Sequence, residues 1–375
     1  MSVYLKAIYK MKSTKIKEAA EALVIGQSIG NPYLRSNYET AEMLEKYSAR
    51  VTNITPLADA SYEVETLFPL SLFTPGSFTH FLTVVMGGQM DIDIIQGCRL
   101  IGLEIPEQLI KSFPGPKLGI EGIRNKIDVH GRPLIGGIVK PKTGLSLDVL
   151  CRMVEAMVEG GIDFIKEDEI LGEIEGAPVL KRIEAVNKVL AGSKVIYAPA
   201  INVPLSQYPE VANALNESNH IYGYHLNVWA GLDAFCYLSK LANKVSFYQK
   251  SGDGVMTKEN YSIAFDVWCL LARLAGADMI HVGMMGGYLD ESKAVLEKRL
   301  SALQDPYYGH HGTIPSFSCG ATPAHVPILQ EAFGNDIMIS AGGSIHSHPE
   351  GTTAGVREFR RMADDCAKSP CEVVA

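Results

Sequence analysis

Long apolar stretches are absent from this chain, and none reaches the roughly 20 residues that a membrane-spanning helix needs. The first fifteen residues carry scattered lysines and lack the apolar core and small-residue cleavage site of a signal peptide. The seven cysteines are dispersed and form no Cys-x-x-Cys pair, which is typical of reduced thiols. We therefore expect a cytoplasmic protein without a membrane segment.

The chain also has fewer basic than acidic residues. The chain has 34 Lys and Arg residues against 42 Asp and Glu, a formal net charge of -8. This balance disfavours nucleic acid and anionic membranes as partners, although a local site can still bind a small anion. With 47% hydrophobic and 20% charged residues, the composition is that of an ordinary globular protein. A length of 375 residues predicts one very large domain or two ordinary ones.

The first third of the chain mixes helical and strand patterns. Helical spacing occurs over residues 13–25 and 77–86, and strand-like alternation occurs over 49–57 and 61–67. These segments predict an N-terminal α+β domain, which we place at residues 1–125.

From Pro133 onward the pattern becomes a repeat of one strand followed by one helix. The predicted strands are 134–140, 162–166, 194–198, 221–226, 245–249, 279–282, 314–318 and 337–340. The predicted helices are 147–159, 180–190, 209–217, 232–242, 258–274, 292–303, 325–333 and 355–367. Eight such units predict an α/β fold, a C-terminal (β/α)8 TIM barrel over residues 126–375. A doubly wound open sheet is the alternative. In a barrel, the chemistry lies at the carboxyl ends of the strands.

The most informative motif follows the second predicted barrel strand. Lys166 and Asp168 share one face, because side chains alternate along a strand, and Glu169 begins the loop. Carboxylate oxygens are ligands that suit Mg²⁺. A lysine among acids is costly to bury unless it is paired or lies beside a bound cation. The alternative is a solvated acidic loop with a lysine in a salt bridge.

Three further basic residues are candidates for catalysis. Lys140 and Lys142 flank Pro141 after the first barrel strand, and a lysine near other cations can have its pKa lowered enough to act as a base. His281 lies within the sixth strand and would contact a substrate if it points inward. The alternatives are a surface pair of lysines and a core histidine.

Small residues follow the last two barrel strands and predict a phosphate site. Gly342 and Gly343 after the eighth strand let backbone N–H groups approach an anion, and Ser318 and Gly320 form a neighbouring turn. Phosphate sites recur at this place in TIM barrels. Ordinary turns are the alternative interpretation.

Taken together, these segments resemble the large subunit of RuBisCO. Residues 138–146, IVKPKTGLS, are similar to the first barrel strand of that family with its two active-site lysines. Residues 160–169, GGIDFIKEDE, resemble its metal-site segment. The resemblance implies that Lys166 is carbamylated and holds Mg²⁺ together with Asp168 and Glu169. It also implies a phosphorylated small-molecule substrate and a homodimer, or an assembly of dimers, in which one subunit covers the barrel of the next.

Several positions depart from the RuBisCO pattern. Tyr288 stands where RuBisCO has the lysine that holds the added carbon dioxide, and Gln249 and Lys250 replace a histidine-arginine pair. The N-terminal motif with glutamate, threonine and tryptophan appears as GQSIGNP at 26–32. These departures match the RuBisCO-like proteins, which keep enolisation chemistry and lack carbon fixation. The lysine base that the diketo-methylthiopentyl phosphate enolase has near Gly88 is absent here.

The resemblance implies magnesium-dependent enolisation, a proton transfer of the isomerase or tautomerase type, on a phosphorylated ketose or keto compound. Methylthioribulose phosphate and diketo-methylthiopentyl phosphate, both intermediates of methionine salvage, are candidate substrates. A decarboxylase of the 3-oxo-isoapionate 4-phosphate type and a non-catalytic regulatory homologue are the alternatives. On this hypothesis Lys140 is the base, Lys142 gives electrostatic support and His281 contacts the substrate. The phosphate-binding residues would be Ser318, Gly320, Gly342 and Gly343.

Overall fold

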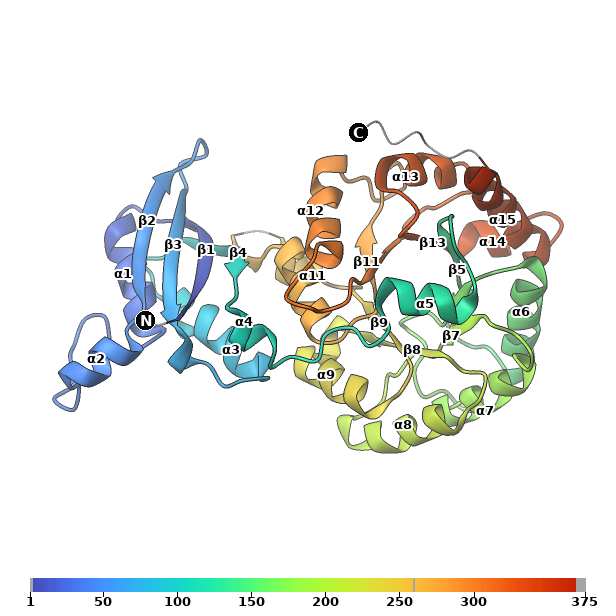
Figure 1. The fold of residues 1–375 in the computed structure, drawn as a ribbon, viewed down its shortest axis with the longest axis horizontal. Helices are drawn as coiled ribbons and strands as arrows, with labels where there is room; N and C mark the ends of the chain where they lie inside the picture. The colour runs from blue at the N-terminus through green and yellow to red at the C-terminus, as the bar shows by residue number, and fades with distance from the viewer. Residues whose placement is uncertain (1–2, 259, 369–375) are drawn as a thin grey trace. The chain divides into compact units, whose positions relative to one another are not determined.

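The computed structural model describes residues 3–258 and 260–368. It divides into two compact units (Figure 1). One unit ends at Pro114 and adds Gly252–Leu271, and the other comprises Gly115–Ser251 and the chain from Ala272. No helix within the described ranges has the length and apolar character to cross a bilayer. Six cysteines lie in these ranges as thiols without disulfides, and Cys371 lies outside them.

The N-terminal unit is built on a five-stranded sheet in the order β10-β4-β1-β3-β2. The central strand β1 pairs antiparallel with β3 and β4. Its even-odd alternation is strict, with Leu5, Ala7, Tyr9 and Met11 buried and the residues between them half-buried. The strands are β1 (Tyr4–Lys12), β2 (Arg50–Pro56), β3 (Tyr62–Pro69), β4 (Gly97–Glu104) and β10 (Tyr261–Ile263). The helices before the barrel are α1 (Ile16–Gly26), α2 (Ala41–Tyr47), α3 (Phe78–Val85), α4 (Glu107–Ile110) and α5 (Gly119–Ile127).

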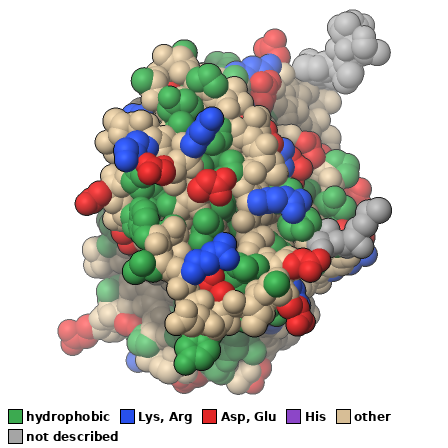
Figure 2. All heavy atoms as spheres, turned by 90° about the vertical axis from the view of Figure 1, so that its left-hand side faces the viewer, with side chains coloured by type: hydrophobic (Ala, Val, Ile, Leu, Met, Phe, Trp, Pro, Cys, Tyr) green, Lys and Arg blue, Asp and Glu red, His purple; other side chains and the backbone are tan. Residues whose placement is uncertain are grey.

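The surface of this unit carries mixed charges. Figure 2 shows Lys, Arg, Asp and Glu side chains of the described residues interspersed with hydrophobic ones across the face that it draws. Lys6 pairs with Glu65 at 2.8 Å and Lys10 with Asp59 at 2.6 Å on the half-buried side of β1. Lys6 and Lys10 are therefore each matched by a neighbouring carboxylate, whereas Lys12 donates to Asn260.

The predicted helix 258–274 is wrong in its first part. The structure has α10 (Gly254–Thr257), the short strand β10 and then α11 (Phe265–Leu274), while Glu259 lies outside the described residues. β10 runs parallel to β4, with Ser262 opposite Arg99 and Ile263 opposite Leu100. A tertiary strand pairing here overrides the local helical preference of the sequence.

The second unit is the predicted barrel of eight parallel strands, in the order β7-β6-β5-β13-β12-β11-β9-β8. A parallel bridge between Ala200 and His225 joins the two ends of that order, β7 and β8. The backbone N–H of His225 donates to the Pro199 carbonyl at 3.0 Å, and that of Ile201 donates to the His225 carbonyl at 3.0 Å. These bonds close the sheet into a barrel, so the open-sheet alternative is wrong. The strands are β5 (Leu134–Ile138), β6 (Phe164–Lys166), β7 (Ile196–Ala198), β8 (Gly223–Asn227), β9 (Val245–Gln249), β11 (Met279–Gly283), β12 (Ile314–Phe317) and β13 (Met338–Ala341).

Helices follow the barrel strands and surround them in Figure 1. α6 begins after Ser146, whose hydroxyl accepts a hydrogen bond from the Val149 N–H, and ends at Gly161 in the left-handed region. This cap and glycine fix the helix between strands β5 and β6. The barrel helices are α6 (Leu147–Gly160), α7 (Val179–Val189), α8 (Tyr208–Glu217), α9 (Leu232–Leu241), α11, α12 (Lys293–Gln304), α13 (His325–Phe333), α14 (Gly343–His346) and α15 (Thr352–Lys368).

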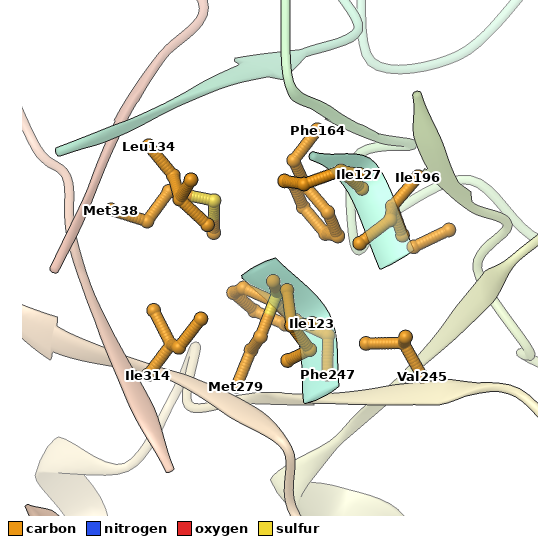
Figure 3. Packing of buried hydrophobic residues seen from close by; sticks show 11 residues of the cluster. Ile123, Ile127, Leu134, Phe164, Ile196, Val245, Phe247, Met279, Ile314 and Met338 are labelled. Atoms are coloured by element: carbon orange, nitrogen blue, oxygen red, sulfur yellow. The ribbon is translucent and has the colours of Figure 1, made fainter. Parts of the chain in front are cut away.

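An apolar layer fills the barrel at the amino ends of its strands. Figure 3 shows the side chains of this layer turned toward one another, with Ile123 and Ile127 of α5 among them. The layer contains Leu134, Phe164, Ile196, Val245, Phe247, Met279, Ile314 and Met338, and Ala198 at the end of β7 packs against it. Phe164 and Phe247 stack with ring centroids 5.4 Å apart. This end of the barrel is therefore a packed floor, and any site must lie at the opposite end.

The floor should contribute strongly to stability. We expect Ile123→Ala to lower the free energy of unfolding by about 2–5 kcal/mol, because it removes fully buried methyl groups and leaves a cavity. Urea denaturation followed by circular dichroism would measure the change. The matched control is Ile328→Ala on α13, where the side chain is half exposed and the change should stay within about 0.5 kcal/mol. Equal effects for the two variants would contradict this account of the floor.

Candidate active site

The barrel interior changes from apolar to polar toward the carboxyl ends of the strands. Two residues after Phe164, Met279 and Phe247, the same inward face carries Lys166, His281 and Gln249. All of these side chains are buried. The polar layer also contains His225, Ser316 and Ser340. Ser316 and Ser340 are hydrogen-bonded to each other at 2.9 Å. A polar layer directly above a packed apolar floor is therefore the site that the barrel offers.

Lys166 is the most unusual residue of this layer because its amine is 1% exposed. Its Nζ donates to Glu169 Oε2 at 3.2 Å and to the Glu167 carbonyl at 3.1 Å. Burial lowers the pKa of Lys166, and the positive charge of Lys140 acts in the same direction against the opposing pull of Glu169 and Asp168. The result is an amine that loses its proton more readily than an exposed lysine does.

Glu169 is held as a carboxylate by three neighbours. Gln249 Nε2 donates to its Oε2 at 2.7 Å and Ser251 Oγ donates to its Oε1 at 2.7 Å. Burial alone would raise the pKa of Glu169, but Lys166 and the Ser251 hydrogen bond hold that pKa well below its usual range. The carboxylate is therefore both charged and fixed in orientation.

Asp168 forms the second carboxylate of the site and is paired with Lys140. The Lys140 ammonium donates to Asp168 Oδ2, and the Ile170 N–H donates to Asp168 Oδ1 at 3.1 Å. Asp168 is buried, whereas the Lys140 side chain is 31% exposed. Lys140 therefore reaches from the open mouth of the barrel to the buried carboxylate. Lys142, two residues on, is exposed and is not brought into this group.

Glu167, the middle acid of the motif, points away from the site. Its carboxylate accepts from Arg182 Nε at 3.0 and 3.1 Å, from the Tyr197 hydroxyl at 2.5 Å and from the Ala200 N–H at 2.8 Å. Both Glu167 and Arg182 are fully buried. This cluster ties the end of β6 to α7 and to the segment after β7, and it fixes where Lys166 and Asp168 stand on the opposite face.

His281 points into the polar layer, as its predicted role requires. Its Nδ1 lies 3.2 Å from Ser318 Oγ and 3.4 Å from the Ser316 carbonyl, and its ring packs edge-on against Phe247 at 4.7 Å. Burial, with the charge of Lys166, lowers the pKa of His281 to about 3. The imidazole is therefore neutral at physiological pH and acts as a hydrogen-bonding group.

The predicted phosphate residues lie at the same end of the barrel. A Cβ at Gly342 would lie 3.0 Å from the Lys140 side chain and 3.2 Å from the Ile138 carbonyl, so a larger residue there would crowd Lys140. Gly343 faces open space. Gly320 has a φ of +99°, which glycine adopts without strain. The structure thus brings Gly342 to Lys140 and Ser318 to His281.

Tyr288 lies at the barrel mouth and is 85% exposed. Its backbone N–H donates to the Cys319 carbonyl at 3.1 Å, which attaches the β11–α12 loop to the turn after β12. Partial burial and the neighbouring Cys319 raise the pKa of its hydroxyl above the ordinary value. Tyr288 is therefore uncharged at neutral pH and supplies no cation at this place.

A metal site cannot be recognised here from unmodified side chains. Among the described residues, no three His, Cys, Asp or Glu side chains form a cluster able to hold a metal ion. Asp168 and Glu169 supply two carboxylates, and Lys166 stands where a third ligand is needed. Three buried polar atoms of the same layer have no hydrogen-bond partner in the described structure: Gln249 Oε1 and both ring nitrogens of His225. Such atoms are suited to hydrogen-bonding a ligand, an ion or water at this end of the barrel.

A closed (β/α)8 barrel with its polar residues at the carboxyl ends of the strands defines the class, a TIM-barrel enzyme. The family model for the catalytic domain of the ribulose bisphosphate carboxylase large chain matches residues 119–374, and the model for its N-terminal domain matches residues 5–109. The chain therefore belongs to the RuBisCO large-chain family. Within that family it is an enzyme of the RuBisCO-like type and not a carboxylase.

Three relatives illustrate the likeness. A 2,3-diketo-5-methylthiopentyl-1-phosphate enolase of Exiguobacterium sibiricum is 30% identical, over 96% of this chain and 92% of the relative. A rubisco-like protein (MtnW) from Alicyclobacillus acidocaldarius is 28% identical with a TM-score of 0.86, over 98% and 97% of the two chains. The octameric RuBisCO of Pyrococcus horikoshii shares the fold, with a TM-score of 0.92 at 24% identity over 97% of this chain and 88% of that one.

The buried pair that anchors β6 gives a stability prediction. We expect Arg182→Met to lower the free energy of unfolding by about 3–5 kcal/mol, because it leaves the Glu167 carboxylate buried without its cation. Thermal and urea unfolding would measure the loss. Lys188→Met, on the same helix but in an exposed pair with Glu184, is the control and should change stability far less. A small effect of Arg182→Met would show that Glu167 does not depend on this partner.

Proposed function

We propose that the chain is a magnesium-dependent RuBisCO-like enolase that moves a proton next to a carbonyl group of a phosphorylated diketo compound. One observation carries the proposal: the buried amine of Lys166, with its lowered pKa, lies beside the carboxylates of Asp168 and Glu169. The enolase named among the relatives supports this substrate class, with the chemistry of methionine salvage. Carbon dioxide fixation is excluded from the proposal because Tyr288 carries no positive charge.

The donor set fits a hard divalent cation once Lys166 is modified. Asp168 and Glu169 offer carboxylate oxygens, and a carbamate on Lys166 would add a third anionic oxygen donor to them. Lys166, Asp168 and Glu169 are thus the residues that would hold Mg²⁺. When bound, Mg²⁺ supplies Lewis-acid stabilisation of the negative charge that develops on a carbonyl oxygen as a neighbouring carbon loses its proton.

The remaining roles fall to residues around the barrel mouth. Lys140 is the proposed base, because it is the lysine that reaches from solvent to the site. Its ammonium must first release a proton to solvent, and the neutral amine then accepts the substrate proton. Neutral His281 orients the substrate by hydrogen bonding, with Ser318 as its partner. Lys142 adds positive charge near the entrance. The backbone N–H groups of Gly320, Gly342 and Gly343 and the hydroxyl of Ser318, whose own N–H donates to the Gly283 carbonyl, bind the phosphate.

The proposal extends to the assembly and location of the protein. A homodimer or an assembly of dimers is supported by the octameric state named for the Pyrococcus horikoshii RuBisCO and by the exposed side chains of Tyr33, Leu34 and Tyr38. Light scattering of the purified protein would measure its mass. The dispersed thiols support a cytoplasmic location.

The metal-site hypothesis has a direct test. Lys166→Met should reduce Mg²⁺-dependent deuterium uptake from D₂O into 2,3-diketo-5-methylthiopentyl-1-phosphate to below about one hundredth of the wild-type rate, because it removes the proposed third ligand. Mass spectrometry of the substrate would follow the exchange. Lys181→Met, on an exposed position of α7, is the control and should exchange at the wild-type rate. Unchanged exchange by Lys166→Met would remove the metal-site assignment.

The proposed base can be tested separately from the metal. Lys140→Gln should slow the same exchange by about a hundredfold to ten-thousandfold, the usual contribution of a positioned base, while Mg²⁺ binding measured by calorimetry persists. Lys142→Gln changes an exposed charge in the same loop and should cost less than about tenfold. If the two variants lose equal activity, Lys140 is an electrostatic residue rather than the base.

A further inference from the structure

His225 is the one residue of the polar layer for which the described structure offers no use. The ring is 1% exposed, and neither of its nitrogens makes a hydrogen bond of normal geometry to a described residue. The Glu167 carbonyl, which accepts a hydrogen bond from Lys166 Nζ, acts on the ring as well. A neutral imidazole carries one N–H donor and one acceptor nitrogen, and leaving both buried and unpaired is costly. In the sequence, this histidine is marked only by being a polar residue at an inward position of a barrel strand.

The position of His225 relates it to Lys166. The two residues stand on β8 and β6, with only β7 between them. At this level β7 and the segment after it contribute alanine: Ala198 is the partner of Lys166 and Ala200 is the partner of His225. Because Ala198 and Ala200 have small side chains, they leave space between β6 and β8 for the side chains of Lys166 and His225. Lys166, Glu169 and His281 all act electrostatically on the His225 ring.

The charge state of Lys166 decides what His225 can bind. An ammonium has only N–H donors, so it offers nothing to the N–H of His225. Carbamylation reverses this: the neutral Lys166 nitrogen bonds to the carbon of carbon dioxide, a C–O electron pair moves onto oxygen, and the nitrogen releases a proton to water. The side chain then ends in a carboxylate, which is an acceptor. This step belongs to the proposed function, and the inference below rests on it.

We propose that His225 is a positioning residue that donates a hydrogen bond from its ring N–H to the carbamate of Lys166. The hydrogen bond satisfies a donor that is otherwise buried without a partner, and it favours the modified over the unmodified lysine. His225 also limits the rotation of the carbamate, so that the third anionic oxygen donor stays beside Asp168 and Glu169. It takes no part in the proton transfer itself.

The test measures the modification rather than the activity. Purified protein with Mg²⁺ is titrated with ¹³C-bicarbonate, and the carbamate carbon is followed by ¹³C NMR. The signal should be present in the wild type and absent from Lys166→Met. His225→Leu replaces the imidazole with an apolar side chain that cannot donate a hydrogen bond. It should raise the bicarbonate concentration needed for half-modification of Lys166 by about tenfold to a hundredfold, the usual effect of losing a hydrogen bond to a charged group.

Two conservative variants identify the donor nitrogen. The side-chain amide nitrogen of Asn lies near the position of His Nδ1, and that of Gln lies near Nε2. One of His225→Asn and His225→Gln should therefore keep a nearly wild-type bicarbonate dependence, and the other should behave like His225→Leu. The comparison of the Asn and Gln variants still tests the hydrogen bond if His225→Leu fails to fold. Tyr224→Phe, on the opposite face of the same strand, is the control and should leave the titration unchanged.

The outcomes separate this inference from the proposed function. A wild-type titration curve for His225→Leu would overturn the role of His225 while the modified lysine stands. Equal loss in the Leu, Asn and Gln variants would also overturn it, because it would indicate packing rather than hydrogen bonding. No carbamate signal in a wild-type protein that still performs Mg²⁺-dependent exchange would refute both the role of His225 and the carbamate ligand of the proposed metal site, while the enolase activity would stand. If the wild-type protein showed neither a carbamate signal nor Mg²⁺-dependent exchange, the proposed function would be refuted.

Discussion

A lysine amine shut away from water at the end of β6 is the constraint on which the site depends. An isolated ammonium in such a place would be unstable, and two features relieve it here: the carboxylate of Glu169 at 3.2 Å and the carbonyl of Glu167 at 3.1 Å. Burial nevertheless lowers the pKa of Lys166. The Lys166 amine can therefore exist as a paired ammonium or as a reactive neutral base. The neutral form can be converted into an anionic ligand that lies beside the carboxylates of the site.

The strand that carries this lysine is anchored from its outer face. Along β6 and its flanks, Phe164, Lys166 and Asp168 point into the barrel while Asp163 and Glu167 point out. Asp163 accepts two hydrogen bonds of 2.7 Å from Arg132 and one of 2.8 Å from the Ile135 N–H. Glu167 is fixed by Arg182 in the same manner. Five of the six residues from 163 to 168 thus belong to the floor, the site or the anchors. The acidic residues of the motif therefore serve two purposes: Asp168 lies in the site, and Asp163 and Glu167 anchor the strand.

Much of this arrangement was open to prediction because it depends on local sequence. The eight strand-helix units follow hydrophobic periodicity, and alternation places Lys166 and Asp168 on one face. What could not be predicted depends on partners far away in the chain. β10 is a strand only because β4 lies beside it, and the alternation of β1 was obscured by Tyr4 and Ile8, two apolar residues on its more exposed face. Glu167 differs from Asp168 and Glu169 through Arg182, fifteen residues on.

Residues with no motif of their own were the hardest to predict. His225 looks like any core residue of a barrel strand until both of its nitrogens are seen to lack partners in the described structure. Gln249 was recognised as a departure from the RuBisCO pattern, but its hydrogen bond to Glu169 at 2.7 Å needed the three-dimensional structure. A signal in the sequence existed for each, a polar residue at an inward strand position, yet such residues are more often satisfied core groups.

The departures from RuBisCO have a common electrostatic consequence. Gln249 donates a neutral hydrogen bond to Glu169 where the related carboxylases have a histidine, and Tyr288 brings a neutral phenol to the barrel mouth in place of a lysine. Lys166, Asp168 and Glu169 are all present, with Gln249 hydrogen-bonded directly to Glu169. Tyr288 therefore removes a positive charge from the place that would stabilise a newly added carboxylate, while the groups able to acidify a carbon remain. Enolisation needs only the groups that acidify a carbon, whereas carboxylation also needs the positive charge. The chain can therefore keep enolisation without carboxylation.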